Sequence, residues 1–277
     1  MLNASGDLLI ADAARGLVVV DRSSRRTAVL SARVSPGAGP HAGTPIMLAD
    51  DLDIAGDGTI YFSDATAFAP PRQVDGSYDA MAPATKTMLE ASCTGRLLRY
   101  DPASGHTAVL ADGIWFANGV ALAPDESYVV VAETLGARLL RVWLRGPKAG
   151  KTEVFADNLP GLPDGLSRAS SPPGAFWVAC VRVPPCKGLQ SLETLARWRL
   201  LRWALLRLPL PRPLDSPHGL VLKVDDSGRV IQALHDATGE AARTVTAVTE
   251  HAGKLYLGSL APDLHATPVL DLAAVPR

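Results

Sequence analysis

Side chains that commonly carry out chemistry are sparse in this 277-residue sequence and fall into no familiar catalytic arrangement. No GxSxG nucleophile elbow, P-loop, GxGxxG fingerprint or HExxH zinc motif is present. The six histidines form no recognisable nucleophile–base pattern; they are His41, His106, His218, His235, His251 and His265. For His41, which precedes an acidic pair, a surface-loop position is the favoured interpretation. Motifs alone therefore identify no catalytic residue.

The cysteines do not indicate a metal or redox site. Cys93, Cys180 and Cys186 match neither a zinc-binding nor a CxxC spacing. Because their number is odd, at most one disulfide can form within the chain, and the pairing stays open. The redox compartment stays open as well.

Acidic and amide side chains remain, and each of the notable ones has a turn-like sequence context. Asn118 precedes a glycine, and Asn-Gly is a strong turn dipeptide by itself. Asp164 stands between a proline and a glycine, which is again a turn composition. The pair Asp50-Asp51 can be interpreted as a solvated acidic turn. Composition alone thus makes all of them turn candidates.

The overall composition is that of a soluble or peripheral protein with a sizeable core. Apolar residues make up 47% of the chain and charged residues 20%. The formal net charge of −1 gives no electrostatic reason to expect a nucleic-acid partner. No uninterrupted apolar stretch reaches the roughly 18 residues of a membrane span. The first residues also lack the basic and apolar regions of a signal peptide, so we expect no targeting segment in this chain.

The elements that must position any site are short strands. A recurring phrase joins a Gly, Asp or Pro turn to a run of β-branched and aromatic residues. It predicts strands within 8–12, 59–64, 127–133, 175–179 and 254–258. Two further phrases predict strands within 16–21, 95–101, 137–142 and 219–225, and within 107–110, 152–155 and 230–234. Several strands per unit, repeated at roughly 45–80 residues, favour propeller blades over a β-sandwich.

Two segments interrupt this rhythm. The polar, proline-containing segment from about Phe68 to Ser92 is predicted to be a long loop. Residues 187–212 have leucines at helical spacing together with several arginines, which predicts a basic amphipathic helix. Such a helix could lie on a membrane surface, or it could cap the sheets with its arginines solvated. The second interpretation is favoured.

Several of these phrases, in this order, resemble the strictosidine synthase-like family. They are Asp50-Asp51-Leu52, Gly58 to Asp64, Gly95 to Asp101, Phe116 to Pro124, Val131 to Thr134, Leu159 to Asp164, Glu250-His251 and Leu255 to Ser259. Together they span essentially the whole chain. Within the family the chain is similar to the adipocyte plasma membrane-associated proteins. The wider superfamily includes calcium-dependent phosphotriesterases, paraoxonases and gluconolactonases.

The resemblance implies an all-β fold, a six-bladed β-propeller lacking its first blade, with an amphipathic helical insertion at about 187–212. A single propeller domain over 1–277 is expected. Family members carry an N-terminal anchor or signal and a first blade that supplies a metal-binding Glu. The resemblance therefore implies a membrane-associated or endomembrane and secretory location for the complete protein. A membrane surface could contact residues 187–212.

For the site, the resemblance implies calcium held by oxygen ligands from several blades. Asp50, Asn118 and Asp164 fall on the ligand positions, although the family usually has Asn where Asp50 stands. Gly165 falls where paraoxonases have Asn, so a ligand is lost there. With the first-blade Glu absent from this chain, three ligands would need water to complete the shell.

For the activity, the resemblance implies a calcium-dependent hydrolase of esters or lactones, of the arylesterase kind, acting on a small-molecule substrate. True strictosidine synthases use a catalytic Glu four residues before the Glu-His pair, where this chain has Thr246. A hydroxyl cannot replace that acid/base group, so we expect no strictosidine synthesis. Glu250 and His251 are expected to be structural. The alternative function is a non-catalytic, membrane-associated binding propeller.

Overall fold

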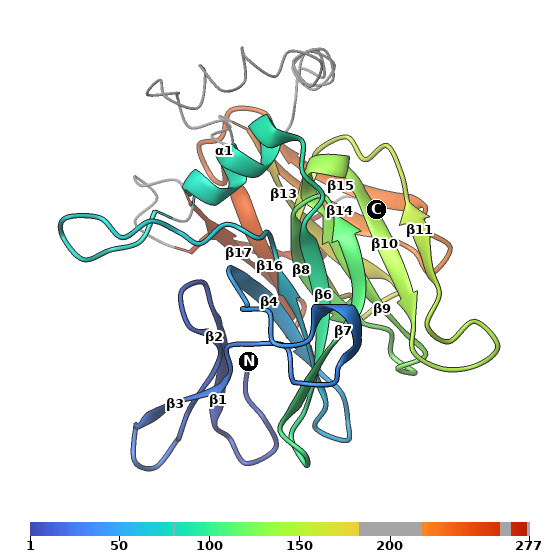
Figure 1. Ribbon diagram of the computed structural model, residues 1–277. Coiled ribbons are helices and arrows are strands. Elements are labelled where there is room, and N and C mark those ends of the chain that lie inside the picture. The colour runs from blue at the N-terminus through green and yellow to red at the C-terminus, as the bar shows by residue number, and fades with distance from the viewer. Residues whose placement is uncertain (80, 183–217, 261–266, 276–277) are drawn as a thin grey trace. The chain divides into compact units, whose positions relative to one another are not determined.

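The computed structural model describes residues 1–79, 81–182, 218–260 and 267–275. Two compact units divide the chain, and the boundary between them follows Leu122. The first unit contains Met1–Leu122, and the second contains the described residues from Ala123 onward. Nearly all regular structure is antiparallel β-sheet, with five sheets in the described residues (Figure 1).

The first unit begins with two sheets whose strands pair in chain order. The strands of the first are β1 (Leu8–Asp12), β2 (Gly16–Val20) and β3 (Thr27–Ser31). Those of the second are β4 (Ala49–Ile54), β5 (Ile60–Asp64), β6 (Gly95–Asp101) and β7 (His106–Ile114). The last strand of this unit is β8 (Ala117–Leu122).

The remaining sheets follow the same order of pairing. The third sheet has the order β11-β10-β9-β8 and contains β9 (Tyr128–Glu133), β10 (Arg138–Trp143) and β11 (Thr152–Ala156). The fourth consists of β12 (Leu162–Arg168), β13 (Phe176–Arg182), β14 (Gly219–Val224) and β15 (Val230–Asp236). The fifth consists of β16 (Val245–His251), β17 (Lys254–Ser259) and β18 (Val269–Asp271). Three- and four-stranded sheets formed by consecutive strands are the blade unit of β-propellers.

The strands expected from the repeated phrases are confirmed, but one class of strand was not predicted. Each of β4, β8, β12 and β16 begins its sheet. The Asp, Asn, Gly and Pro content of β4, β8 and β12 had indicated turns, whereas β16 has none of these residues and was not identified as a strand. The turn interpretations of Asp50-Asp51, Asn118 and Asp164 are therefore wrong, because all four residues lie within strands.

The segment expected to be a long loop contains the one α-helix of the described residues, α1 (Met81–Glu90), drawn in teal in Figure 1. The Asp79 carboxylate caps it by accepting hydrogen bonds from the amides of Met81, at 3.0 Å, and Ala82, at 3.2 Å. Pro83, Ala84 and Thr87 are buried on one face, and Leu89 is buried as well. The loop prediction failed because it gave weight to the polar composition and not to this N-terminal cap. The described residues also contain three short 3-10 helices, at Gly39–His41, Thr134–Gly136 and Leu272–Ala274.

Each unit has its own apolar core between neighbouring sheets. In the first unit, Leu9 and Leu17 of the first sheet pack with Leu52, Phe62 and Leu98 of the second. In the second unit the core joins residues of the fourth and fifth sheets; its members include Trp177, Val221, Val248, Leu255 and Leu257. Each fully buried Leu or Phe contributes roughly 1.5–3 kcal/mol, so these contacts fix how each pair of sheets packs.

The all-β prediction is confirmed, with five sheets in the described residues instead of six. The amphipathic insertion predicted at 187–212 lies outside the residues that the structure describes. Among the described residues, no helix is long and apolar enough to cross a membrane.

Candidate functional site

The residues expected to bind a metal occupy equivalent places in their sheets. Asp50 is the second residue of β4, Asn118 is the second of β8, and Asp164 is the third of β12. Thr246 is the second residue of β16. Asp50 and Asn118 belong to the first unit, and Asp164 and Thr246 belong to the second.

A β-bulge redirects the chain at Asp50. In the pairing of β4 with β5, Asp50 and Asp51 together lie opposite a single residue, Ser63. The Ser63 hydroxyl accepts a hydrogen bond from the Asp51 amide at 3.0 Å, which fills the gap in the ladder. Bulges re-aim side chains and are frequent beside active sites, so this one distinguishes Asp50 from an ordinary strand residue.

A second bulge lies at the corresponding place in the second unit. In the pairing of β12 with β13, Asp164 and Gly165 lie opposite Ala179 alone. The register of β16 with β17 also shifts at Thr246. The strands β4, β12 and β16, each the first of its sheet, thus have a shift in pairing register at the position that the sequence comparison with the family singled out. No sequence pattern predicted these bulges.

Asp50 has an unusual electrostatic environment. Its side chain is accessible to solvent, but the surrounding protein reduces the hydration of the carboxylate. This desolvation, together with the nearby charge of Asp51, raises the pKa of Asp50 to about 7. A cation placed at this carboxylate would favour the ionised form, so the environment suits a cation ligand.

Asp51 and Asp53 join β4 to β8. One carboxylate oxygen of Asp51 accepts a hydrogen bond from the Val120 amide at 2.9 Å. Two residues further along both strands, a carboxylate oxygen of Asp53 accepts one from the Leu122 amide, also at 2.9 Å. The sequence reasoning missed this role of both residues. The alternation of acids at 51 and 53, which puts both side chains on one face of a strand, was the available signal.

Asn118 is buried, with only 5% of its surface exposed. The described part of the chain offers its side-chain amide no hydrogen-bond partner. Buried polar groups in native proteins almost always have a partner, in the protein, in ordered water or in a ligand. Asn118 has no side-chain atom that is both fully buried and unpartnered, so its amide reaches the solvent and is open to a ligand from that side.

Asp164 lies beside a buried thiol. Burial raises the pKa of Cys180, and the negative charge of Asp164 raises it further. The Cys180 thiol is thus held in its neutral form and is a poor nucleophile. Cys93 is exposed and also free, and Cys186 lies outside the described residues.

Gly165 has no room for the side chain that paraoxonases have at this position. A Cβ atom on Gly165 would lie 2.6 Å from the carbonyl oxygen of Thr246 and 3.1 Å from the Cα of Ala247. Separations below about 3 Å do not occur for real Cβ atoms. The close approach of β12 to β16 therefore explains this departure from the expected ligand set.

Glu250 has a structural role, as expected. Its carboxylate accepts hydrogen bonds from the Trp177 indole at 2.6 Å and from the Ser170 amide at 3.0 Å. Burial alone would raise the pKa of Glu250, but these hydrogen bonds outweigh it and hold the pKa below its ordinary value. A carboxylate that is stabilised in this way joins β16 to β13 and is not poised to accept a proton.

A buried ion pair fixes the chain where it enters β4. The Asp64 carboxylate, 1% exposed, pairs with the Arg96 guanidinium. It also accepts hydrogen bonds from the amides of Met47, at 3.0 Å, and Leu48, at 2.9 Å. Arg96 donates to the Thr44 hydroxyl at 2.7 Å. The network thus positions the segment that leads to Asp50.

The expected loop histidine has a specific partner. Nε2 of His41 lies 2.6 Å from a carboxylate oxygen of Asp112, and 29% of the His41 side chain is exposed. This pair joins a short 3-10 helix to β7 and lies at the surface, in agreement with the loop interpretation.

The donor set fits a hard cation in its chemistry. Asp50, Asn118 and Asp164 all provide oxygen, which calcium prefers. Among the described residues, no group of three or more His, Cys, Asp and Glu side chains is arranged to hold a metal ion. Asparagine is not one of these four residue types, so a site that combines carboxylates with the amide of Asn118 is kept as a proposal.

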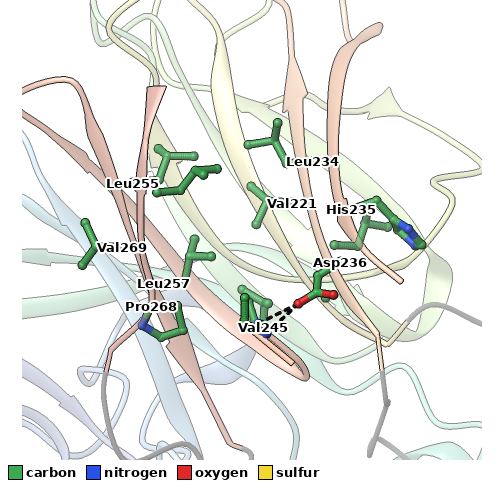
Figure 2. Close-up of a pocket in the computed structure, with 14 residues that line it drawn as sticks. Val221, Leu234, His235, Asp236, Val245, Leu255, Leu257, Pro268 and Val269 are labelled. Carbon is green, nitrogen blue, oxygen red and sulfur yellow. Dashed lines mark hydrogen bonds between the residues drawn. The ribbon is translucent and has the colours of Figure 1, made fainter. Parts of the chain in front are cut away.

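The second unit also has an apolar pocket of about 210 Å³ between the fourth and fifth sheets. Figure 2 shows its walls, which are formed by aliphatic side chains such as Val221, Leu234, Leu255 and Leu257. His235 and Asp236 also line the pocket, but the Asp236 carboxylate accepts the Ala241 and Ala242 amides, each at 2.9 Å. Asp236 provides the single carboxylate among the lining residues of this pocket, and backbone amides already use it as an acceptor.

Comparison with known proteins agrees with the resemblance seen in the sequence. The strictosidine synthase family model matches residues 50–147. The chain is 38% identical to Protein STRICTOSIDINE SYNTHASE-LIKE 10 from Arabidopsis thaliana over 92% of its own length and 64% of that protein. It is 33% identical to the human adipocyte plasma membrane-associated protein over 92% of its length and 58% of that protein. The chain thus spans less than two thirds of the length of these relatives.

Solved structures show the fold. A gluconolactonase from Xanthomonas campestris superposes with a TM-score of 0.57 at 19% identity, over 93% of this chain and 67% of that one. The calcium-binding protein regucalcin from Agrobacterium tumefaciens gives 0.55 at 16% identity, over 95% and 67%. At such identities the likeness establishes the β-propeller fold and not the activity.

Proposed function

Because this chain is a relative of the strictosidine synthase-like proteins, we propose that it forms part of a calcium-dependent hydrolase of esters or lactones. The observation that carries the proposal is the amide of Asn118, whose residue is 5% exposed and whose amide reaches the solvent without a hydrogen-bond partner in the described part of the chain. An oxygen-binding cation would satisfy the carbonyl of this amide. Regucalcin, which has a similar fold, is a calcium-binding protein, and this adds support.

In the proposed site, Asp50 and Asn118 of the first unit hold the ion, and Asp164 is a further ligand that the family resemblance implies. When bound, calcium supplies a Lewis acid that polarises the carbonyl oxygen of the substrate and stabilises the developing oxyanion. The bulges at Asp50 and Asp164 support the proposal, because bulges re-aim side chains beside active sites. The charge of Asp51 next to Asp50 adds to the attraction for a cation.

Strictosidine synthesis is not part of the proposal. Position 246, where true synthases have the catalytic carboxylate, is a threonine in this chain. Its hydroxyl is too weak an acid and too weak a base to replace a carboxylate near neutral pH, so a condensation that needs an acid/base carboxylate has no such group there. Hydrolysis that relies on cation-polarised carbonyls does not need this group.

The test is hydrolysis of phenyl acetate and of δ-valerolactone, with calcium, after a chelator such as EGTA, and after calcium is restored. We expect activity that the chelator abolishes and calcium recovers. Asp50→Asn should weaken the response to calcium, whereas Asp57→Asn, in the turn between β4 and β5, is the matched control and should not. Hydrolysis that is indifferent to chelation would reject the proposal.

A second function, a non-catalytic binding propeller docked on a membrane, is supported by the relatives named plasma membrane-associated. It relies on the basic stretch at 187–212, which lies outside the described residues. Binding to anionic vesicles should fall as salt rises and should be lost when Arg197, Arg199 and Arg202 are replaced by Gln. An absence of vesicle binding at low salt would remove this alternative.

The number of blades in the complete protein is also a proposal. The described residues contain five sheets, and we propose that the complete protein has a sixth, the first blade of a six-bladed propeller. A sixth sheet would belong to the longer relatives, of which this chain spans 58–65% in the matches to the adipocyte proteins. A structure of such a relative would test it directly.

A further inference from the structure

Two strands of the first unit, β4 and β8, each begin a sheet, and side chains connect them. Strands β4 and β8 belong to different sheets, so no backbone ladder joins them. The carboxylates of Asp51 and Asp53 accept hydrogen bonds from the Val120 and Leu122 amides, each at 2.9 Å. In a strand, the groups that point to the same side recur at every second residue. Two bonds that are two residues apart on both strands therefore fix how far β8 is shifted along β4.

Each of these two carboxylates also accepts a hydrogen bond from a backbone amide of β4, which orients it. The second oxygen of Asp51 accepts the Leu52 amide at 2.8 Å, and that of Asp53 accepts the Ile54 amide at 2.8 Å. Asp53 is 3% exposed. A charged acceptor that is oriented and desolvated in this way forms a stronger bond than a neutral one.

The bond from Asp51 lies next to the proposed cation ligands, and the bond from Asp53 does not. Asp51 directly follows Asp50, and its partner Val120 is two residues beyond Asn118. The bond of Asp53 lies two residues further along both strands. The two bonds thus have the same chemistry and length but differ in their distance along the chain from the site.

We propose that Asp51 is a positioning residue, which holds Asn118 at the correct place beside Asp50 for cation binding. Asp53 performs the same structural task without affecting the ligands. The inference rests on the proposed function, since it concerns the same cation site. It adds a residue that binds no cation itself and acts through the backbone of β8.

The test compares Asp51→Asn with Asp53→Asn in the full chain. Each variant removes one negative charge and weakens one hydrogen bond to β8. Because Asp51 is adjacent to Asp50, loss of its charge also lowers the affinity for a cation, so the lifetime and hydrogen exchange are needed to separate positioning from charge. Terbium is the probe for the calcium site, with its affinity measured by titration of the emission and its bound waters counted from lifetimes in H₂O and D₂O. Loss of a residue that orients metal ligands typically costs about 10- to 100-fold in affinity. We expect that loss, and a changed lifetime, for Asp51→Asn, and less than about twofold for Asp53→Asn.

Hydrogen exchange gives a readout that does not need the cation. The amides of Asn118 to Val120 should exchange faster in Asp51→Asn, while in Asp53→Asn the increase should centre on Leu122. Equal terbium affinity in the two variants would overturn the positioning role. If amide hydrogen exchange is unchanged in Asp51→Asn, the role of the Asp51–Val120 hydrogen bond in holding β8 against β4 is overturned. An absence of terbium emission from the unmodified chain would instead overturn the proposed function, and the role of Asp51 in cation binding with it.

Discussion

The carbonyl oxygen of Thr246 lies only 2.6 Å from the point where a Cβ atom on residue 165 would be. Strands β12 and β16 approach each other this closely only because residue 165 is glycine. The position that in paraoxonases carries a ligand is therefore occupied here by backbone packing.

Gly165→Asn, which introduces the paraoxonase residue, should therefore destabilise the chain. The new side chain would force β12 away from β16, and overpacking of this kind typically costs about 1–3 kcal/mol. Urea unfolding monitored by tryptophan fluorescence gives the free energy of unfolding. A variant as stable as the unmodified chain would show that the two strands can separate freely.

Asn118→Leu should abolish cation binding without a loss of stability. Asn118 is 5% exposed and its amide has no partner in the described part of the chain, so replacing it with an apolar group of similar shape loses no hydrogen bond within the protein. The free energy of unfolding without calcium should stay the same or rise, by up to about 1–2 kcal/mol. Calcium should then no longer raise the melting temperature, as it should for the unmodified chain. A fall of more than about 2 kcal/mol would indicate that Asn118 is a structural residue.

Arg96→Met should be strongly destabilising, because it leaves the Asp64 carboxylate buried without its cation. Breaking a buried pair from one side costs about 3–5 kcal/mol. Arg145→Met is the matched control, since Arg145 pairs with Glu126 at 3.2 Å but is 63% exposed. Exposed pairs contribute at most about 1 kcal/mol. Similar losses for the two variants, measured by urea unfolding, would contradict the central role of Asp64 and Arg96.

Asp225 should contribute to the acid sensitivity of folding. Hydrogen bonds from the Ser227 hydroxyl and the Arg229 amide lower its pKa to about 2. The unfolded chain has an ordinary value near about 4, so the stabilisation is complete above about pH 4 and is lost as the pH falls through about 2.

In Asp225→Asn this part of the pH dependence should disappear, so the loss of stability between about pH 5 and about pH 2.5 should be smaller than in the unmodified chain. Urea unfolding at a series of pH values is the measurement. Ser227→Ala, which removes one donor, should fall between the two. Identical pH profiles for all three proteins would contradict the assignment to Asp225.

The sequence by itself determined the repeated strands and the resemblance to the strictosidine synthase-like proteins. The turn-and-strand phrases around Ile60–Asp64 and Gly95–Asp101 follow local rules, since turn residues and β-branched runs express their preferences over a few residues. The phrases that resemble the strictosidine synthase-like proteins identified the relatives and placed Asp50, Asn118 and Asp164 as candidates.

Only the tertiary structure decided what surrounds those candidates. The bulge at Asp50, the bond from Val120 to Asp51 and the contact of Gly165 with Thr246 each join residues that are far apart in sequence or depend on strand register. Local propensity does not encode register between neighbouring strands, because it arises from side-chain packing and hydrogen bonding across them. For the same reason β4, β8 and β12, which contain Asp, Asn or Gly, had the composition of turns. They form strands because neighbouring strands of the same chain supply hydrogen-bond partners for their backbone.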